Sequence, residues 1–166
     1  MRIALSCAVV CVMLGAASQL AVAQPKYGVT VRTVNRDALT RTKTYEWMES
    51  QSSPDKSVDA LIVAAVDREL AARGLTKLLV GRADVEVTYR TLSRTDVTAN
   101  KDRKEDAFRE FAVGTLVVDL TDPTSRQLLF GVRMDTPIER DPKTIEATIN
   151  GAVTAMFEKF PTPPKK

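Results

Sequence analysis

Three short segments of this chain alternate apolar and polar side chains with a period of two residues. They span residues 83–90, 114–120 and 127–134. Period two is the repeat of a β-strand, whose successive side chains point to opposite faces of a sheet. Between the last two segments, Asp122–Ser125 has the composition of a turn, so we expect an antiparallel hairpin there. The pattern therefore predicts a sheet with one apolar face and one mixed face.

Two further segments, which precede these three in the chain, are also predicted to be strands. Residues 27–33 alternate over a β-branched run, and a shorter strand is expected at 42–47. The second segment contains Trp47, the only tryptophan of the chain. A single tryptophan beside a sheet is more often a packing residue than a platform for a ligand.

Two segments, one after Ser53 and one after Asp141, carry apolar residues at helical spacing, so that each would present one apolar face. For the first helix, Ser53 is expected to cap and Pro54 to occupy the first position, where no N–H is needed. Gly74 is expected to end it in a left-handed conformation. Asp141 and Pro142 predict the start of the second helix by the same reasoning.

The predicted order is β-β-α-β-β-β-α, which indicates an α+β domain. The economical packing places both helices on one face of an antiparallel sheet of about five strands. The long polar link at 92–113 is uncommon in a compact domain. We expect an extension of the hairpin or a short helix near 104–110 there, in preference to a functional or mobile loop.

The N-terminus has the features of a cleavable secretory signal. Arg2 precedes an apolar stretch at residues 3–14, and small residues lead to a cleavage site between Ala23 and Gln24. The alternative is an uncleaved anchor, but a span needs about 20 consecutive apolar residues. We therefore expect a cleaved signal at 1–23, a single periplasmic domain at 24–161 and a short tail at 162–166.

Both cysteines, Cys7 and Cys11, lie inside the predicted signal. Neither has the surroundings of a lipidation motif, so we expect no lipid anchor and no transmembrane span in the mature protein. A mature chain without cysteine has no disulfides, thiolate nucleophiles or thiolate metal sites. The chain also has no histidine, which excludes Ser-His-Asp and Cys-His catalysis and the common zinc sites.

The charges and glycines exclude further classes of protein. Basic and acidic residues number 24 and 21 and are interspersed, whereas a nucleic-acid-binding protein usually clusters its bases. No glycine-rich phosphate loop occurs. The sequence therefore predicts no nucleic-acid partner and no cofactor.

The sheet face away from the helices is the one surface that the pattern lets us nominate for interactions. Its candidate residues are Asp84, Glu86, Val117, Asp119, Leu129 and Arg133. Three of these are carboxylates, which could act as an acid/base pair or bind a divalent cation. Cross-strand pairing with arginine would explain the same residues without any activity. The catalytic hypothesis fails if the carboxylates lie apart or if each pairs with an arginine.

Several pieces of the chain, taken in order, resemble a known family. They are 44–47 (Thr-Tyr-Glu-Trp), 70–75 (Leu-Ala-Ala-Arg-Gly-Leu), 83–89 (Ala-Asp-Val-Glu-Val-Thr-Tyr), 114–122 (Gly-Thr-Leu-Val-Val-Asp-Leu-Thr-Asp) and 157–161 (Phe-Glu-Lys-Phe-Pro). This arrangement resembles the bacterial envelope family called domain of unknown function four-one-three-six. The resemblance implies a periplasmic or outer-membrane-associated domain of a Gram-negative bacterium, and it brings no catalytic residues. Many such proteins are lipoproteins and often carry tryptophan before the glycine of the last strand, where this chain has Phe130.

We therefore expect a non-enzymatic module of the cell envelope that binds a protein or another envelope component. A small-molecule or lipid carrier is the first alternative, and it requires an apolar pocket between the helices and the sheet. The second alternative is a carboxylate-dependent hydrolase or cation-binding domain. Peripheral association with the outer membrane stays open.

Overall fold

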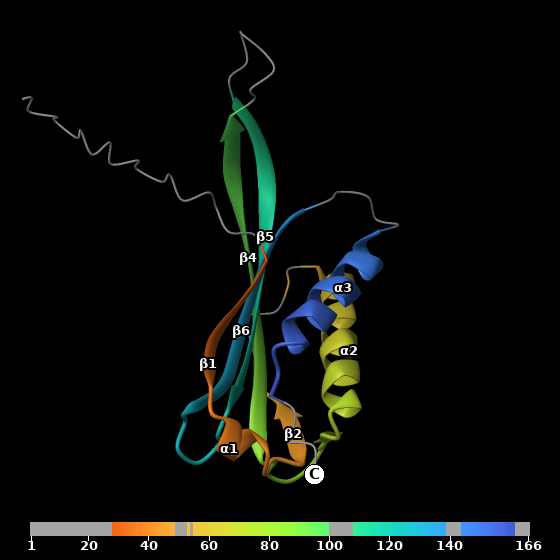
Figure 1. Ribbon diagram of the computed structural model, residues 1–166. Coiled ribbons are helices and arrows are strands. Elements are labelled where there is room, and N and C mark those ends of the chain that lie inside the picture. The colour runs from red at the N-terminus through yellow and green to blue at the C-terminus, as the bar shows by residue number, and fades with distance from the viewer. Residues whose placement is uncertain (1–27, 49–52, 54, 100–107, 139–143, 162–166) are drawn as a thin grey trace, which may run out of the picture.

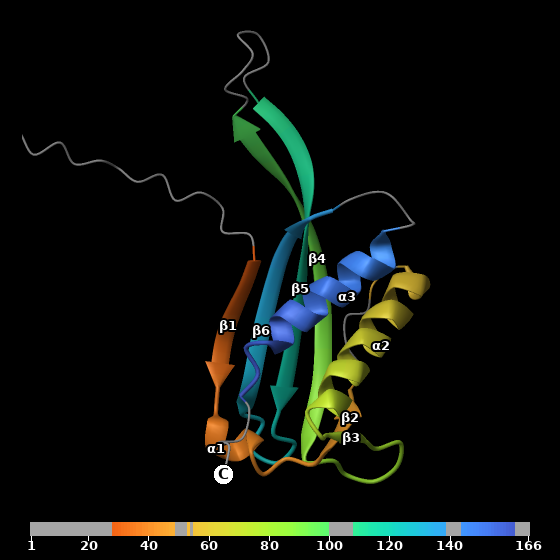
Figure 2. The same cartoon turned by 45° about the vertical axis from the view of Figure 1, so that its right-hand side comes forward.

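A computed structural model describes residues 28–48, 53, 55–99, 108–138 and 144–161. The chain forms a six-stranded sheet with two long helices on one of its faces (Figures 1 and 2). The elements are β1 (Gly28–Val34), α1 (Arg36–Leu39), β2 (Thr44–Trp47), α2 (Lys56–Ala72), β3 (Thr76–Lys77), β4 (Val85–Ala99), β5 (Phe108–Thr121), β6 (Leu128–Pro137) and α3 (Ile145–Phe157).

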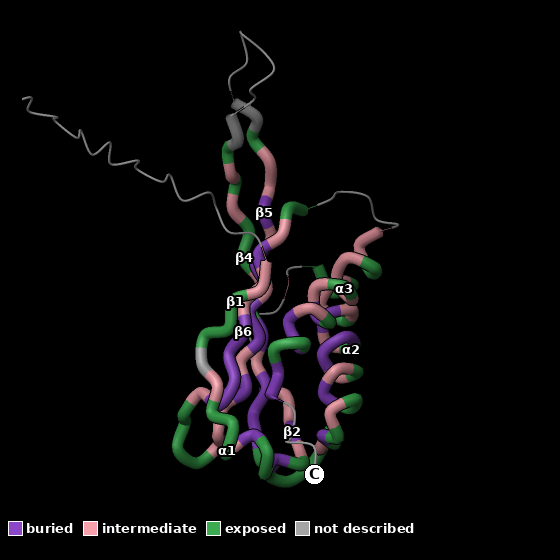
Figure 3. Tube along the Cα trace, in the orientation of Figure 1, coloured by how far each residue is buried: buried purple, intermediate pink, exposed green. Residues whose placement is uncertain are grey.

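The predicted α+β class and the placement of both main helices on one face are confirmed. The strands lie in the order β1-β6-β5-β4-β2-β3. The apolar residues of the alternating segments point toward α2 and α3, and Figure 3 shows the resulting band of buried residues along the sheet. Val85, Val118 and Val132 are all fully buried there, as the period of two predicts.

The prediction of an antiparallel sheet is correct for four strands and wrong for the other two. β1, β6, β5 and β4 pair antiparallel, whereas β2 pairs parallel with both β4 and β3. The reason is that α2 follows β2 and carries the chain back to the end of the sheet from which β2 starts. β3 and α1 are also additional to the predicted order, because two and four residues are too few to show a period.

The C-terminus of α2 follows the prediction, but its N-terminus does not. Gly74 has a φ of 83°, and the N–H of Leu75 donates to the carbonyl of Leu70, so that Leu75 is buried over the last turn. The cap is Asp55, whose carboxylate accepts from the N–H of Ser57, and not the predicted Ser53. α3 begins at Ile145 with Thr144 as its N-cap, so the predicted start at Asp141 and Pro142 is wrong. Those two residues and Pro54 lie outside the described residues.

Two acidic side chains of α2 attach the helix to the sheet. Asp67 accepts hydrogen bonds from the hydroxyl of Tyr45, the indole N–H of Trp47 and the ammonium of Lys77, at 2.8, 2.8 and 2.9 Å. Tyr89 donates in the same way to Asp59, and its ring contacts Trp47 edge-on at 6.1 Å. Trp47 is therefore a packing residue with a satisfied N–H, as predicted.

The long link at 92–113 is largely an extension of a hairpin. β4 continues to Ala99, and β5 begins at Phe108, so the two strands stay paired well beyond the rest of the sheet (Figure 1). The alternative of a helix near 104–110 is wrong for 108–110, which belong to the strand. Residues 100–107 lie outside the described part of the chain.

Within the described residues, none of the helices is long and apolar enough to cross a membrane. The predicted signal at 1–23 and the tail at 162–166 lie outside them.

Candidate functional site

The candidate interaction face presents paired charges and little apolar surface. Val117 lies between Arg90 and Arg133 in the sheet register, and only 6% of it is exposed. Arginine side chains commonly cover neighbouring apolar residues with their methylene stems while the charged group reaches water. Val117, a predicted interaction residue, is therefore not available to a partner on this face.

Leu129 departs from the predicted alternation and belongs to the buried core cluster. The register shifts between Leu120 and Thr121, which face Phe130 and Leu128, so Leu129 is the extra residue of a bulge. Its exposed fraction is 4%. A bulge interrupts the alternation of side chains, which explains why a strict period of two misplaced this residue.

Asp119 is held by two arginines from different strands. The guanidinium groups of Arg32 on β1 and Arg90 on β4 each donate to it at 3.0 Å. The bond from Arg32 passes over β6 at Gly131, where an added Cβ would lie 3.0 Å from the Asp119 carboxylate and 3.3 Å from Arg32. The glycine therefore leaves room for an ion pair that spans three strands.

Arg133 belongs to a second charge cluster, built around a residue that the sequence did not single out. Asp135 accepts from Arg133, Arg94 and the hydroxyl of Thr115, at 2.7, 2.9 and 2.5 Å for the shortest bond to each. The hydrogen bond from Arg133, with those from Thr115 and Arg94, outweighs burial and holds the pKa of Asp135 well below its usual range.

The other two candidate carboxylates have separate partners. Glu86 pairs with Arg126 at 2.5 Å. Asp84 accepts from the backbone N–H groups of Lys43 and Thr44 at 2.8 and 2.9 Å, and the Lys43 bond is the main cause of its lowered pKa. Among the described residues, no group of three potential metal-ligating side chains occurs. Because each candidate carboxylate has its own partner, the geometry does not support an acid/base pair.

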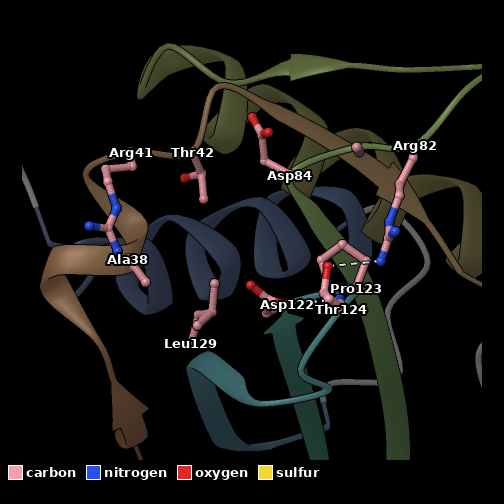
Figure 4. Close-up of a pocket in the computed structure, with 10 residues that line it drawn as sticks. Ala38, Arg41, Thr42, Arg82, Asp84, Asp122, Pro123, Thr124 and Leu129 are labelled. Atoms are coloured by element: carbon pink, nitrogen blue, oxygen red, sulfur yellow. Dashed lines mark hydrogen bonds between the residues drawn. The ribbon is translucent and has the colours of Figure 1, made fainter.

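A polar hollow of about 430 Å³ lies at the end of the molecule where α1 and the turn between β5 and β6 meet (Figure 4). Arg41 and Arg82 stand on opposite sides of it, and Arg82 donates to the hydroxyl of Thr124 at 2.9 Å. The carboxylate of Asp122 accepts from the backbone N–H groups of Thr124 and Ser125. The two arginines and the carboxylates of Asp84 and Asp122 therefore give this hollow side chains of both charges.

An apolar pocket of about 400 Å³ lies between the helices and the sheet. It is enclosed by the N-terminal halves of α2 and α3, by the middle of β5 and by the end of β6. The residues that line it are Ser53, Val58, Ile62, Thr91, Leu92, Ser93, Gly114, Thr115, Leu116, Met134, Thr136, Pro137, Ile138, Ile145, Thr148, Ile149 and Ala152. None of them is charged, and pockets for small ligands are commonly of this size and character.

The space between the helices and the sheet is filled differently at its two ends. At the C-terminal end of α3, Phe130, Phe157 and Phe160 pack with ring centroids 5.0 to 6.0 Å apart, and we call this end the closed half. The other end is lined by Leu116 and Ile149 and contains the apolar pocket, and we call it the open half.

Gly114 shapes the wall of the pocket. An added Cβ at this position would lie 3.2 Å from Cγ1 of Ile138, which is closer than ordinary packing. The N–H of Ile138 donates to the carbonyl of Ala112 and fixes this residue beside the strand. Ile138 is 44% exposed, so it lies at the rim of the pocket.

Solved structures that resemble this fold share little sequence with it. A PDZ domain protein from Parabacteroides distasonis matches with a TM-score of 0.58 and 12% identity, over 84% of this chain and 36% of that chain. This chain therefore spans little more than a third of that protein. The PelC dodecamer from Paraburkholderia phytofirmans matches with a TM-score of 0.50 and 11% identity, over 81% of this chain and 99% of that chain. At such identities the likeness shows the fold alone.

The comparison with sequence families is more specific than the comparison of folds. Among curated proteins, no match was found. The match to a family model includes β1 from Thr30 onward, the other five strands of the described sheet and its three helices. This model carries the description Domain of unknown function (DUF4136) and matches residues 30–162, and the chain belongs to that family.

Proposed function

We propose that this protein is a non-enzymatic binding module of the bacterial cell envelope that holds the acyl chain of a lipid in the apolar pocket. The observation that carries the proposal is the pocket itself, about 400 Å³ of space lined by uncharged and mainly aliphatic side chains. A closed, filled core would have left no place for such a ligand.

The residues that line the apolar pocket favour an uncharged portion of a ligand. Leu116, Met134 and Ile149 supply apolar walls, while the hydroxyls of Ser93 and Thr148 are among the few polar groups. Burial of a charge against such a wall without a partner costs several kcal/mol or more, whereas burial of a methylene group contributes about 0.8 kcal/mol. An acyl chain fits this chemistry better than a sugar or a nucleotide.

The free sheet face offers less support for a protein partner. Val117 and Leu129, its expected apolar residues, are 6% and 4% exposed, and the charges around them pair within the molecule. The geometry therefore favours a lipid-binding module over a docking surface on that face. The predicted signal at 1–23 supports a location in the envelope, where lipids are the abundant apolar ligands.

Two alanines of α3 provide a matched test. Ala152 lines the apolar pocket, and Ala147 is exposed on the same helix. We expect Ala152→Phe to fill the pocket and to weaken the binding of a dansyl-labelled fatty acid at least about tenfold, since it displaces several buried methylene contacts. Ala147→Phe adds the same ring outside the pocket and is expected to bind like the wild type. Fluorescence titration gives the affinities, and circular dichroism confirms folding.

Equal binding by the wild type and by a folded Ala152→Phe variant would contradict the proposal. The absence of saturable binding to the wild type, with competing unlabelled fatty acid as the reference, would contradict it as well.

A further inference from the structure

Three hydroxyl groups in the lining of the apolar pocket are available for hydrogen bonds to a ligand. They belong to Thr91 and Ser93 on β4 and to Thr148 on α3. Within the described part of the chain, these three side chains form no hydrogen bond. Every fully buried polar side-chain atom of that part has a partner, so these hydroxyls are solvent-accessible. A ligand that fills the pocket must either pair with them or cover them unpaired, and the second outcome costs free energy.

One row of residues across the sheet is polar where it borders the pocket, and we call it the polar row. Ser93, Gly114 and Thr136 lie side by side in the register of β4, β5 and β6. Since Gly114 has no side chain, two hydroxyls flank bare backbone there. The hydroxyl of Thr136 donates to the carbonyl of Pro137 at 3.5 Å, which is longer than a strong hydrogen bond. The polar row therefore offers polar groups to a ligand and adds little apolar wall.

The next rows toward the closed half are more apolar. The row that follows the polar row contains Thr91, Leu116 and Met134. The row after that contains Val118 and Val132, both fully buried. Figure 2 shows the N-terminal ends of α2 and α3 on the side of the projecting hairpin, which is also the side of the polar row. The pocket therefore has a polar end toward the hairpin and an apolar end beside the packed core.

The polar end suits a neutral group better than an ion. None of the residues that line the pocket is charged. Arg94, which follows Ser93 on β4, projects to the opposite face of the sheet, where it donates to Asp96 and Asp135. A carboxylate or phosphate in the pocket would find no cation in the lining to offset the loss of its hydration. Hydroxyl and ester groups form hydrogen bonds with serine and threonine without such a cost.

We propose that the lipid in this pocket is uncharged and carries one acyl chain on an ester or hydroxyl group, as in a monoacylglycerol. This inference rests on the proposed function and names the class of its ligand. A pocket of about 400 Å³ is near the lower limit of the range for small-ligand sites, about 300 to 1,000 Å³, which favours one chain over two. The chain lies against Leu116 and Met134, and the oxygens of the head group lie at the polar row.

Competition between two ligands with the same chain tests this assignment. Monododecanoylglycerol and dodecanoate share their acyl chain, and only the second is charged at about pH 8. Each is used below the concentration at which it forms micelles, to displace a dansyl-labelled fatty acid from the full-length protein. Fluorescence measures the displacement. We expect the monoacylglycerol to reach half displacement at a concentration at least about tenfold lower than dodecanoate, which binds through its chain alone.

Removal of two hydroxyls tests their part in this preference. The double variant Thr91→Val/Ser93→Ala keeps the shape of the pocket nearly unchanged, and circular dichroism confirms folding. It is expected to bind the monoacylglycerol at least about fivefold more weakly than the wild type, because hydrogen bonds are lost. Its binding of dodecanoate is expected to be no weaker. Thr95→Val is the matched control and is expected to keep the full preference, since Thr95 is exposed on the same strand outside the lining.

Equal displacement by the two ligands, or better displacement by dodecanoate, would overturn the inference. The proposed function would survive that result, because both chains would still occupy the pocket. A folded double variant that keeps the wild-type preference would also overturn the inference, as would an equal loss in Thr95→Val. Failure of both ligands to displace the probe from the wild type would instead contradict the proposed function, and the inference with it.

Discussion

The two halves of the helix–sheet interface are packed with different kinds of side chain. The closed half is filled by Phe130, Phe157 and Phe160, of which the first two have no exposed surface. The open half is lined mainly by aliphatic side chains together with serine and threonine residues, and Leu116, Met134 and Ile149 are partly exposed there. Aromatic rings fill volume that aliphatic side chains of the same number leave empty.

The polar contacts between α2 and α3 lie at the C-terminal half of α2. Arg73 donates to the backbone carbonyl of Phe157 at 2.6 Å and lies 5.2 Å from the centre of its ring. One residue before Glu69, the exposed Arg68 donates hydrogen bonds to the half-buried side chain of Asn150, at 3.2 and 3.3 Å. We therefore expect the closed half to contribute more to stability than the open half, where the apolar pocket lies.

Truncation of a side chain tests this division most strongly. Phe157→Ala in the closed half is expected to lower the free energy of unfolding by about 3 to 5 kcal/mol, because it leaves a cavity among packed rings. Ile149→Ala in the open half is expected to cost no more than about 2 kcal/mol, since its neighbours already border empty space. Urea unfolding measures both values. Equal losses would remove the distinction between the halves.

The arginines of α2 offer a second test, which compares a largely buried contact in the closed half with an exposed contact. Arg73→Met is expected to cost about 1.5 to 3 kcal/mol, because it removes charged hydrogen bonds to a backbone carbonyl and to Glu69 in a largely buried position. Arg68→Met is expected to cost less than about 0.5 kcal/mol, as for other exposed contacts. Thermal unfolding compares the two variants. A larger loss from Arg68→Met would contradict this account.

The smallest expected effect concerns the pH dependence of the closed half. Burial alone would raise the pKa of Glu69, but hydrogen bonds from Thr154 and Arg73 lower it overall. A lowered pKa in the folded state contributes stability above the unfolded value, and this contribution is lost as the pH falls toward the folded value. Glu69→Gln should therefore be less stable than the wild type at pH 7. The difference should narrow as the pH falls below about 4. A difference that is constant with pH would show that the carboxylate is not the stabilising group.

The sequence predicted those parts of the fold that depend on local periodicity and turn chemistry. The alternation in β4, β5 and β6 identified the core face, and Gly74 marked the end of α2 because only a left-handed residue completes that turn. The parallel pairing of β2 was missed, since a period of two contains no information on strand direction. The bulge at Leu129 was missed for a similar reason, because one inserted residue leaves no mark in composition.

The candidate site was predicted less well than the fold. Cross-strand pairing with arginine was correct for Asp119, whereas Asp84 accepts from backbone N–H groups and Glu86 pairs with Arg126, between β5 and β6. The identity of such partners depends on long-range register, as in Arg32 crossing Gly131. The apolar pocket depends on the distance between Ile149 on α3 and Met134 on β6, which no local pattern contains. A carrier requires an apolar pocket between the helices and the sheet. The three-dimensional structure shows where this pocket lies.

Native mass spectrometry of the protein recovered from envelope fractions tests the central claim most directly. The account predicts one bound lipid per chain in the wild type and in Ala147→Phe, and none in a folded Ala152→Phe variant. The absence of bound lipid from the wild type, or the same bound lipid in all three proteins, would contradict the assignment of the apolar pocket as a lipid site.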